Sequence, residues 1–403
     1  MVLPGSVLIV VENLPLPFDR RVWMEATTLR AAGWGVSIIC PTGKGFEAHR
    51  EVIEGVHIYR HDLPPEGGGI GGYAREYAAA VWHQLRLARR IWRERPFDVV
   101  HICNPPDLLF LVAGLYKILH GARVIFDQHD IMPELYEAKF GRRDLGYRVV
   151  CGAERLTFAM ADVVISTNES YRQIALSRGR KSAADVFVVR SAPDLARFRP
   201  VEPERSFCRG REHLVGYVGV MGPQEGLDHL LRAIHLIVDG DDRQDISFML
   251  IGSGPSLADL KCMAGELGLD DYVEFPGRVP DDELVRRLSS CDVCVNPDPK
   301  NPFNDSSTMN KILEYMALGL PVVQFDLKEG RRSAANASLY ARPNDDKDLA
   351  AQIVRLLDDP GMRTEMGREG ARIMAERLEW RHQVPRLLEA YDAARMRPAR
   401  LRV

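Results

Sequence analysis

Short apolar runs alternate with segments of helical periodicity along almost the whole chain. The first run, at residues 6–11, is followed by an amphipathic segment at 21–34 and by a second apolar run at 35–40. Runs of this length are typical of strands buried on both faces, and strands that alternate with helices form parallel sheets covered on both sides. The sequence therefore predicts an α/β fold with doubly wound parallel sheets.

The alternation runs through two cycles, which predict two Rossmann-like domains in the 403 residues. A polar stretch at 200–213 separates the cycles, so we expect domains at 1–200 and 213–378. The last amphipathic segment, at about 380–397, is expected to pack back onto the first domain. The remaining strands are expected at 56–61, 98–103, 123–130, 162–168, 186–192, 214–221, 246–252, 272–277, 292–297, 321–326 and 338–343.

Composition and charge exclude several function classes. The net charge of −3 and the absence of a recognition motif argue against nucleic acid as a partner. The seven cysteines lack the spacing of a disulfide framework or a zinc site, and no apolar run is long enough to span a membrane. Cys291 and Cys294 form a lone C-x-x-C, which is either part of a buried strand or a metal or redox pair. We expect a cytoplasmic protein.

Positive charge is concentrated in one segment of the first domain. Residues 1–200 hold 26 Lys and Arg against 22 Asp and Glu, whereas the remainder holds 27 against 34. The segment at 73–96 carries six Arg, two Glu and two Trp. Such a helix either docks on an anionic membrane surface or presents a solvated face while its other side packs on a sheet. The glycines at 67–72 are expected to form a loop.

The stretch at 306–326 predicts a short helix that leads into a buried strand. Ser307 or Thr308 is expected to cap the helix, and Lys311 and Glu314 fall on a different face from its apolar residues. Backbone N–H groups at the helix start would hold a diphosphate, Lys311 would add positive charge, and Glu314 lies at about the distance of the ribose hydroxyls. The alternative is an ordinary surface ion pair between Lys311 and Glu314.

Three further strand ends of the second domain carry glycine-rich turns. Gly219 lies near the end of one strand and Gly222 in the turn after it, Gly254 follows another strand, and a third is followed by a turn containing Arg278, which would lie along a base. Glycine allows backbone amides to approach a phosphate. Because ligands of such sheets bind beyond the carboxyl ends of the strands, we expect the site in a cleft between the domains.

These segments resemble glycosyltransferase family 4, whose members are retaining nucleotide-sugar transferases of the GT-B fold. The resemblance covers nearly the whole chain. It rests on EYMALGLPVV, VGYVGVMGPQEGLDHLLRA, LIGSGP and FPGRVPDDEL in the C-terminal half, and on DVFVVRSAPDLARF, DVVHICNPPDLL and IFDQHDIMPE in the N-terminal half. The segment STMNKILEYMALG looks most like the branch that builds bacterial exopolysaccharide, capsule or O-antigen.

The resemblance implies two Rossmann-like domains that face a central cleft, a nucleotide-sugar donor, and neither a metal nor another cofactor. It implies that Glu314 holds the ribose and that His129 lies near the donor sugar and the acceptor, although a lone histidine is usually structural. The catalytic candidates are His129, Lys311 and Glu314. The nucleotide-sugar site is expected to include Gly219, Gly222, Gly254, Arg278, Asp305, Ser307, Thr308, Met309, Asn310 and Glu314.

At three positions the chain lacks a residue that the family pattern uses to bind the donor. Ser306 stands where the first Glu of the E-x7-E motif is usual, Glu225 replaces a usual Lys, and Val220 replaces a usual Arg. The residues expected to compensate are Asp305 or a backbone amide for the Glu, and Arg190, Arg278 or Lys311 for the cations.

Two functions follow from these observations. The first is transfer of a sugar, with retention of configuration, from a nucleotide-diphosphate sugar to a lipid-linked or growing polysaccharide acceptor in bacterial cell-surface polysaccharide synthesis. The basic segment at 73–96 would then hold the enzyme peripherally on the inner face of the membrane. The second, motivated by the departures, is a catalytically silent GT-B protein that binds a nucleotide sugar or scaffolds an assembly complex.

Overall fold

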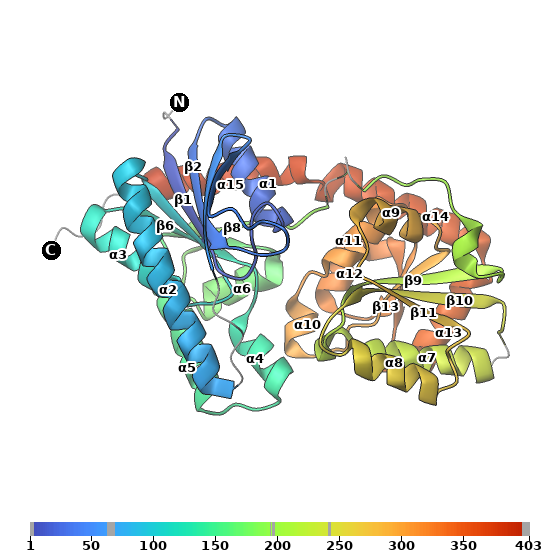
Figure 1. The fold of residues 1–403 in the computed structure, drawn as a ribbon. Helices are drawn as coiled ribbons and strands as arrows, with labels where there is room; N and C mark the ends of the chain where they lie inside the picture. Colours follow the sequence, from blue (N-terminus) through green and yellow to red (C-terminus); the bar gives the residue numbers. More distant parts are fainter. Residues whose placement is uncertain (1–3, 63–68, 194, 196–197, 241–242, 397–403) are drawn as a thin grey trace. The chain divides into compact units, whose positions relative to one another are not determined.

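The apolar runs form two sheets, one in each of two units of the chain. The computed structural model describes residues 4–62, 69–193, 195, 198–240 and 243–396, and for 69–77 the backbone only. One unit comprises Met1–Arg190 with Arg381–Val403, and the other Ser191–Trp380 (Figure 1). The first unit thus ends at Arg190 rather than at residue 200, and the chain returns to it at Arg381. The predicted α/β class with parallel sheets is confirmed.

The N-terminal unit holds an eight-stranded sheet in the order β3-β4-β2-β1-β5-β6-β7-β8. Its strands are β1 (Ser6–Val11), β2 (Gly35–Pro41), β3 (Arg50–Ile53), β4 (Val56–His61), β5 (Val99–Cys103), β6 (Arg123–Gln128), β7 (Val163–Ser166) and β8 (Val186–Val188). All except β3 were expected from apolar runs. β3 is an edge strand that pairs antiparallel with β4, and its residues alternate between half-buried and exposed, so it has no apolar run.

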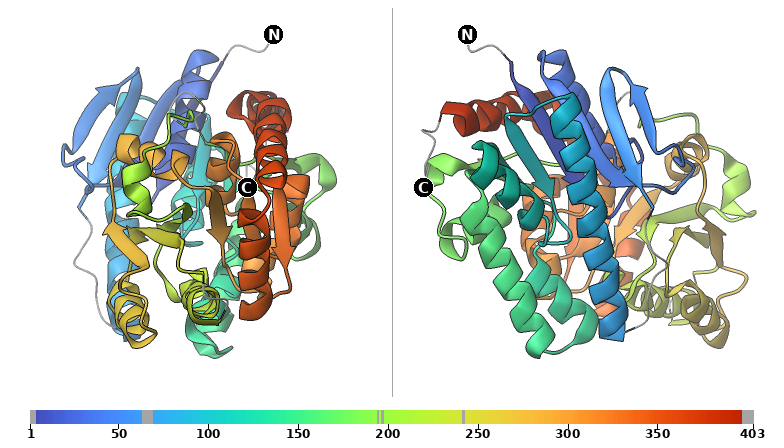
Figure 2. Two further views of the ribbon diagram at one scale, coloured as in Figure 1. Left: turned by 90° about the vertical axis from the view of Figure 1, so that its right-hand side faces the viewer. Right: turned by 60° about the vertical axis from the view of Figure 1, so that its left-hand side comes forward.

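Helices cover both faces of this sheet (Figure 2). The helices are α1 (Arg20–Ala31), α2 (Gly69–Glu94), α3 (Phe110–His120), α4 (Met132–Phe140), α5 (Leu145–Met160), α6 (Glu169–Ser177) and α15 (Trp380–Met396). Buried side chains of α2, α3, α5 and α6 form one core with the face of the sheet that carries Val100 and Ile102. His101, between them in β5, points to the opposite face and bonds Tyr391 of α15.

The C-terminal unit holds a six-stranded, wholly parallel sheet in the order β11-β10-β9-β12-β13-β14. Its strands are β9 (His213–Val220), β10 (Ile246–Ser253), β11 (Val273–Gly277), β12 (Val293–Asn296), β13 (Val322–Phe325) and β14 (Ser338–Ala341). Its helices are α7 (Leu227–His235), α8 (Leu257–Glu266), α9 (Asp281–Ser289), α10 (Pro302–Ser306), α11 (Asn310–Ala317), α12 (Lys328–Ala334), α13 (Asp346–Leu357) and α14 (Pro360–Ile373).

Apolar cores lie on both faces of the second sheet. One core joins the sheet to α7, α8 and α13, and the other joins it to α9 and α11. Cys291 and Cys294 are buried in the second of these cores, where they pack with Leu288 and Tyr315. The lone C-x-x-C therefore contributes to packing in this structure.

Two local expectations are wrong. The glycine segment at 67–72 is not wholly a loop, because α2 begins at Gly69; residues 67 and 68 lie outside the described residues. The N-cap position of α11 is occupied by Met309 rather than by Ser307 or Thr308. Within the part of the chain that is described, no helix has both the length and the apolar character needed to cross a membrane.

The strand order determines where each sheet offers a binding crevice. In the C-terminal sheet the chain runs outward from β9 through β10 to β11, and then continues on the other side of β9 with β12. The switch point therefore lies at the carboxyl ends of β9 and β12, and ligands of open parallel sheets bind at such points. In the N-terminal sheet the corresponding point lies between β1 and β5.

Close packing of β9 and β10 at their carboxyl ends yields a stability prediction. Gly252 pairs with Gly219 and has a φ of +140°, and a Cβ on Gly252 would collide with the Gly219 carbonyl oxygen. Gly252→Ala should lower the free energy of unfolding by about 3 kcal/mol, because strain and overpacking add. Urea unfolding followed by circular dichroism measures this loss.

Gly268→Ala is the matched control for that substitution. Gly268 also has a positive φ, +69°, but a Cβ there would meet nothing within 4 Å. The control should lose only about 1 kcal/mol, the cost of a left-handed alanine. Equal losses for the two variants would contradict the steric argument.

Candidate active site

Lys311 of α11 lies buried at the switch point of the C-terminal sheet. Its Nζ is 2.6 Å from Oε2 of Glu225, in the turn after β9, and 3.2 and 3.3 Å from the two carboxylate oxygens of Asp298, which follows β12. It also stands 5.1 Å from the centre of the Tyr217 ring, whose hydroxyl lies 3.2 Å from the same Glu225 oxygen. One ammonium group therefore binds two carboxylates that come from the two strand ends of the crevice.

The ammonium group of Lys311 faces two carboxyl groups in this cluster. Burial and these neighbouring charges shift the pKa values of Asp298 and Lys311. Burial, together with the nearby Glu225, raises the pKa of Asp298 to about 7, although Lys311 opposes the shift. The pKa of Lys311 lies well above its ordinary value, because Asp298, Tyr217 and Glu225 outweigh the effect of burial. Lys311 thus remains charged, and Asp298 gains or loses its proton near neutral pH.

The surface ion pair considered for Lys311 and Glu314 is not what forms. Lys311 is only 8% exposed, and the partners of its side chain are Glu225 and Asp298. Glu314 is half-buried on the same helix. Helical periodicity placed Lys311 away from the apolar face, but its long side chain buries its stem against Tyr217 and Gly219.

The expected phosphate glycines lie in tightly packed backbone beside this cluster, Gly219 near the end of β9 and Gly222 and Gly254 in the turns after β9 and β10. A Cβ on Gly219 would lie 3.2 Å from Cε of Lys311 and closer still to the Tyr217 hydroxyl. Gly222 precedes the short 3₁₀ turn that carries Glu225. Gly254 abuts the Met221 backbone, to which the β10 turn is tied by hydrogen bonds, so the turns after β9 and β10 form one packed structure.

The segment before α11 is positioned by hydrogen bonds of its own. The Ser307 hydroxyl donates to the Phe303 carbonyl at 2.7 Å and so closes α10. Thr308 is half-buried, Asn310 is exposed at the first position of α11, and Met309 is the N-cap residue. The Met309 side chain makes no capping hydrogen bond, and the N–H of Ile312 donates to the Met309 carbonyl at 3.1 Å.

The other two candidates of this unit lie at different places. One carboxylate oxygen of Asp305 accepts a hydrogen bond of 2.9 Å from the backbone N–H of Lys328, at the start of α12. Arg278 is exposed directly after β11, the edge strand, which is separated from β9 by β10. The structure therefore brings Gly219, Lys311 and the α11 segment together, and it places Arg278 two strands away from β9.

In the N-terminal unit, His129 follows β6 and is held by Asp127. Its Nε2 lies 2.5 Å from Oδ2 of Asp127, a distance that requires a proton between the two atoms. Arg21 of α1 donates to Asp127 through Nε and a terminal nitrogen, at 3.2 and 2.8 Å. Since Nε2 is engaged with the carboxylate, Nδ1 is the ring nitrogen of His129 that remains for another group.

The charged groups next to His129 shift the pKa values of the two neighbouring carboxyl groups, Asp127 and Glu25. Burial favours the neutral form of Asp127, but Arg21 and His129 outweigh it and hold the pKa of that carboxyl well below its usual range. Glu25 lies 3.1 Å from the same arginine, yet burial and the neighbouring Asp127 raise the pKa of Glu25 well above normal. Arg21 therefore neutralises Asp127, while Glu25 favours its protonated form.

The backbone at His129 is held by hydrogen bonds to Asn104, which follows the neighbouring strand β5. Asn104, just after β5, accepts hydrogen bonds from the N–H groups of His129 and Asp130, at 2.7 and 3.1 Å. Its amide nitrogen donates to Asp107 and to the carbonyl of Asp130. The orientation of His129 thus depends on contacts at both its side chain and its backbone.

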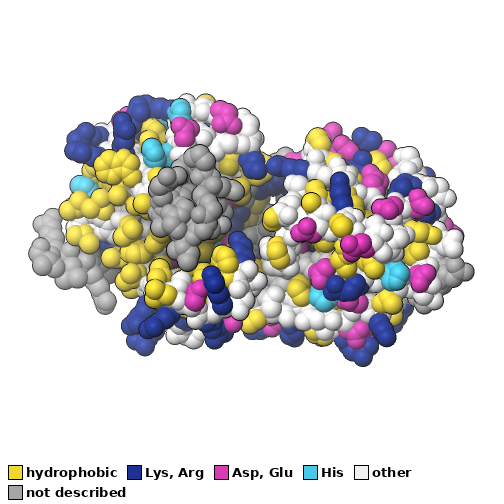
Figure 3. Space-filling model, turned by 60° about the horizontal axis from the view of Figure 1, so that its bottom comes forward, with side chains coloured by type: hydrophobic (Ala, Val, Ile, Leu, Met, Phe, Trp, Pro, Cys, Tyr) yellow, Lys and Arg dark blue, Asp and Glu magenta, His cyan; other side chains and the backbone are white. Residues whose placement is uncertain are grey.

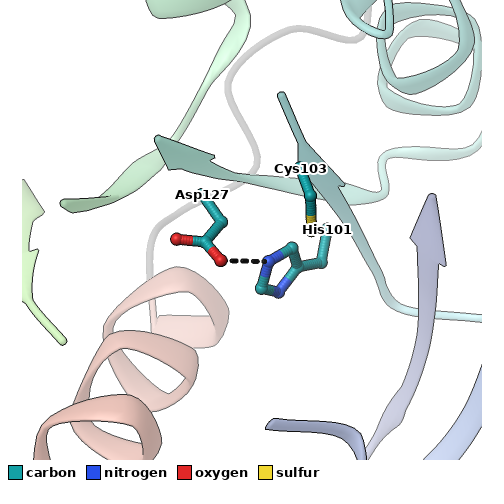
Figure 4. A group of neighbouring side chains, drawn as sticks. All are labelled: His101, Cys103 and Asp127. Carbon is teal, nitrogen blue, oxygen red and sulfur yellow. Dashed lines mark ion pairs between the residues drawn. The ribbon is translucent and has the colours of Figure 1, made fainter. Parts of the chain in front are cut away.

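His101, Cys103 and Asp127 form a buried group whose ligand atoms lie within 4.8 Å of one another (Figure 4). A divalent ion there would compete with Arg21, which already supplies positive charge to Asp127. Burial raises the pKa of the Cys103 thiol well above its ordinary value, so the thiolate that a metal requires is disfavoured. These residues suit an ion-paired network better than a metal centre.

A second such group, Glu212, His213 and Asp245, lies at the amino end of β9. Asp245 is bound there by Arg243 at 2.9 and 3.0 Å, and Glu212 is exposed. The group is remote along β9 from the carboxyl end that holds Lys311.

Several site residues were missed from the sequence. Asp298 and Tyr217 were not singled out, and neither was the pairing of Arg21 with Asp127. One usable signal exists for the aspartates: Asp127 lies inside an apolar run, and Asp298 directly follows one, where a charged residue is unusual. Arg21 lies 106 residues from Asp127 in the chain, and Lys311 lies 13 residues from Asp298 in a different element, so no local pattern identifies these pairs.

The raised pKa of Asp298 predicts a particular pH dependence of stability. The folded protein holds this proton more tightly than the unfolded chain, whose carboxyl has its ordinary pKa of about 4. This residue's contribution to stability therefore falls as the pH rises from about 4 to about 7. Asp298→Asn removes the titration, so the variant should gain about 2 kcal/mol relative to wild type between pH 5 and pH 7.5, measured by urea unfolding.

The exposed Asp270→Asn substitution in the same unit is the control, and it should leave the pH dependence unchanged. A wild-type minus Asp298→Asn difference that is constant with pH would contradict the assignment of a near-neutral titration to Asp298.

Two family models match the chain, one for each unit. Residues 19–192 match the model described as a glycosyl transferase 4-like domain, and residues 212–359 match the model described as glycosyl transferases group 1. The first range falls almost wholly within the N-terminal unit, and the second lies within the C-terminal unit. Each of the two matched ranges thus corresponds to one of the two units and its sheet.

Similar proteins include enzymes that transfer sugars. The 2-deoxystreptamine glucosyltransferase of Streptomyces kanamyceticus is 25% identical over 334 residues, which cover 80% of this chain and 84% of that protein. The sucrose-phosphate synthase of Thermosynechococcus elongatus has a TM-score of 0.80 at 19% identity, with 96% of this chain and 98% of that chain covered. HepE of Anabaena, solved in complex with UDP and glucose, has a TM-score of 0.72 at 15% identity, with 96% and 100% covered. Taken with the two domain matches, these similarities show that the chain is a glycosyltransferase of the GT-B type.

Proposed function

We propose that this protein is a retaining glycosyltransferase of family 4 that moves a sugar from a nucleotide-diphosphate sugar to a lipid-linked or growing polysaccharide acceptor. The observation that carries the proposal is the arrangement at the switch point of the C-terminal sheet. There, glycine residues, a buried cation and the start of α11 meet at the ends of β9 and β12. The similarity to HepE, which was solved with UDP, supports a nucleotide sugar as the donor.

The diphosphate is proposed to bind at the start of α11. Backbone N–H groups at a helix start and the helix dipole favour an anion, and Ser307, Thr308 and Asn310 lie in this segment. Lys311 reaches the turn after β9, and Gly219 and Gly222 carry no side chain that would keep a phosphate from the backbone amides. These groups stabilise the leaving diphosphate without a divalent metal or another cofactor.

Glu225 gives the Lys311 charge a partner before the donor arrives. The 2.6 Å contact between Lys311 and Glu225 means that a diphosphate oxygen must compete with a carboxylate. The ammonium group is held toward the turn by Asp298 as well, so it is already oriented when a phosphate replaces or joins Glu225. This arrangement weakens the affinity for the diphosphate, because Glu225 neutralises part of the positive charge of Lys311.

Glu314 is proposed to hold the ribose of the donor. It lies one turn after Lys311 on α11 and is half-buried, so its carboxylate is near the diphosphate segment without being enclosed in the core. A carboxylate accepts hydrogen bonds from two neighbouring hydroxyls, which suits a ribose. The residue that contacts the donor sugar in place of Ser306 is proposed to be Asp305 or a backbone amide.

His129 is proposed to act near the reacting atoms. The acceptor hydroxyl attacks the anomeric carbon on the face that the nucleotide leaves, the bond from that carbon to the diphosphate breaks, and the departing phosphate oxygen takes the acceptor proton. Asp127 and Asn104 fix the ring, and Nδ1 of His129 then hydrogen bonds to the donor sugar or the acceptor.

The place of action is proposed to be the cytoplasmic side of the membrane, in the synthesis of a bacterial cell-surface polysaccharide. A lipid-linked acceptor presents its sugar at a membrane surface, so a transferase for such an acceptor works there. Positive charge on the N-terminal unit supports this location.

A catalytically silent protein that binds a nucleotide sugar, or scaffolds an assembly complex, is the second candidate. It is favoured by the neutralisation of Lys311 by Glu225 and by Ser306 and Val220, which stand where the family pattern has Glu and Arg. Turnover distinguishes the two: a silent protein binds the donor without hydrolysing or transferring it.

Donor binding predicts a nucleotide-dependent gain in thermal stability. Unfolding of the purified protein is measured with UDP, GDP, ADP, dTDP and CMP, with and without EDTA. One diphosphate at 100 times its dissociation constant should add about 2.7 kcal/mol, a shift of a few degrees, and EDTA should not reduce it. Glu314→Ala should lose most of the shift because the ribose contact is gone.

The matched control is Glu365→Ala, an exposed glutamate on α14 of the same unit, and it should keep the full shift. If no nucleotide stabilises the wild type, the proposed donor site fails. If one does but no sugar is turned over from its nucleotide sugar, the silent protein is the correct candidate.

The role of His129 predicts a loss of rate without a loss of donor binding. Once a donor is known, His129→Ala should lower kcat about 100-fold, while the thermal shift with the nucleotide stays as in wild type. His49→Ala, at an exposed histidine of the same unit, should change neither quantity. Wild-type kcat in His129→Ala would show that the histidine is structural.

A further inference from the structure

The outer surface of α3 is apolar where a solvated helix would be polar. Leu111, Leu115, Ile118 and Leu119 recur at positions i, i+4, i+7 and i+8, and their exposed fractions are 47, 42, 71 and 63%. The opposite side of α3 is also apolar, since its residues pack into the core of the N-terminal unit. A helix that is apolar on both sides has one face that the folded unit leaves uncovered.

The outer surface of α5 repeats this feature. Leu145, Val149 and Leu156 are 75, 61 and 51% exposed and lie on one side of the helix. Arg148 and Arg155, each one position before an exposed apolar residue, are exposed as well. The α5 surface is therefore apolar and basic.

The described part of α2 adds an aromatic residue and a row of cations. Trp82 is 66% exposed, and Arg86, Arg89 and Arg93 follow it at helical spacing on the same side. Arg90 is held by Glu94, but among the described residues no carboxylate forms an ion pair with the other three arginines. Tryptophan and arginine are residues that favour the boundary between water and lipid.

These three helices form one continuous surface, the α2–α3–α5 face. α3 contacts both α2 and α5, and all three pack on the same side of the sheet. Of the thirteen large apolar side chains that are exposed among the described residues, eight belong to this face. They are Trp82, Leu111, Leu115, Ile118, Leu119, Leu145, Val149 and Leu156.

The space-filling view shows the same mixture. In Figure 3 hydrophobic side chains gather on the N-terminal unit with lysine and arginine side chains beside them. A cluster of exposed apolar side chains marks a surface that another phase or molecule covers. Its cations indicate what that partner is.

We propose that the α2–α3–α5 face docks on a membrane surface that contains anionic lipid. The apolar side chains enter the boundary between headgroups and acyl chains, and the arginines contact the headgroups. A second copy of the chain fits less well, because a symmetric contact would bring the same unpaired arginines against each other. The lipid-linked acceptor belongs to the proposed function, whereas the docking face is argued from the surface itself.

The test measures sedimentation of the full-length protein with vesicles, without nucleotide or sugar. One set contains 30% phosphatidylglycerol in phosphatidylcholine and the other is pure phosphatidylcholine. Wild type should bind the anionic vesicles and bind them more weakly as salt rises. The triple variant Arg86→Glu, Arg89→Glu and Arg93→Glu should bind at least about 100-fold more weakly, since each cation contributes about five-fold.

A matched variant controls for net charge. Lys261→Glu, Arg355→Glu and Arg368→Glu make the same change on exposed positions of the C-terminal unit, and this variant should bind as wild type does. The pair Ile118→Ser and Leu119→Ser keeps every cation and tests the apolar part. It should also weaken binding, by more than ten-fold.

Three results would overturn the proposal. They are wild type that fails to sediment with anionic vesicles, equal binding by the two charge variants, and a wild-type dimer in light scattering that Ile118→Ser with Leu119→Ser dissociates. The last would assign the face to a second copy. Because no donor is present, failure here leaves the proposed function intact, and transfer to a water-soluble acceptor still tests that function.

Discussion

A buried cation that faces two carboxyl groups lies near the carboxyl ends of strands in each unit. Arg21 binds Asp127 and Glu25 in the first, and Lys311 binds Glu225 and Asp298 in the second. Lys311 of α11 joins the segments that follow β9 and β12, and Arg21 of α1 binds Asp127 in β6 and the carbonyl of Val189 after β8. Each cation therefore fixes strand ends near the candidate side chains. In each cluster burial, together with the neighbouring carboxyl group, raises the pKa of one carboxyl group above its ordinary value.

Much of the fold follows from short-range patterns in the sequence. Thirteen strands coincide with the expected apolar runs, because a strand of a covered parallel sheet is apolar on both faces. β3 was missed because an edge strand, with its alternating exposure, needs no such run. The start of α2 at Gly69 was missed because local glycine content opposes a helix that the rest of the segment favours.

The candidate site was predictable only where its residues carry a local signature. The glycine turns and the α11 segment were found, because turn chemistry and helix starts are visible in a few residues. The true partners of Lys311 were not, since Glu225 lies 86 residues away and contact arises only when β9 and β12 become neighbours. The covered and uncovered sides of α3 look alike in sequence for the same reason: only packing determines which apolar residues are enclosed.

The cluster of Lys311, Glu225 and Asp298 would also link binding of the proposed diphosphate to the acidity of the solution. With both carboxyl groups ionised the cluster carries one net negative charge, and with Asp298 protonated it is neutral. An anion that binds beside it raises the pKa of Asp298 further, so at neutral pH binding takes up protons from the buffer. The measured heat of such binding then varies with the ionisation enthalpy of the buffer, and the observed affinity increases as the solution becomes more acidic.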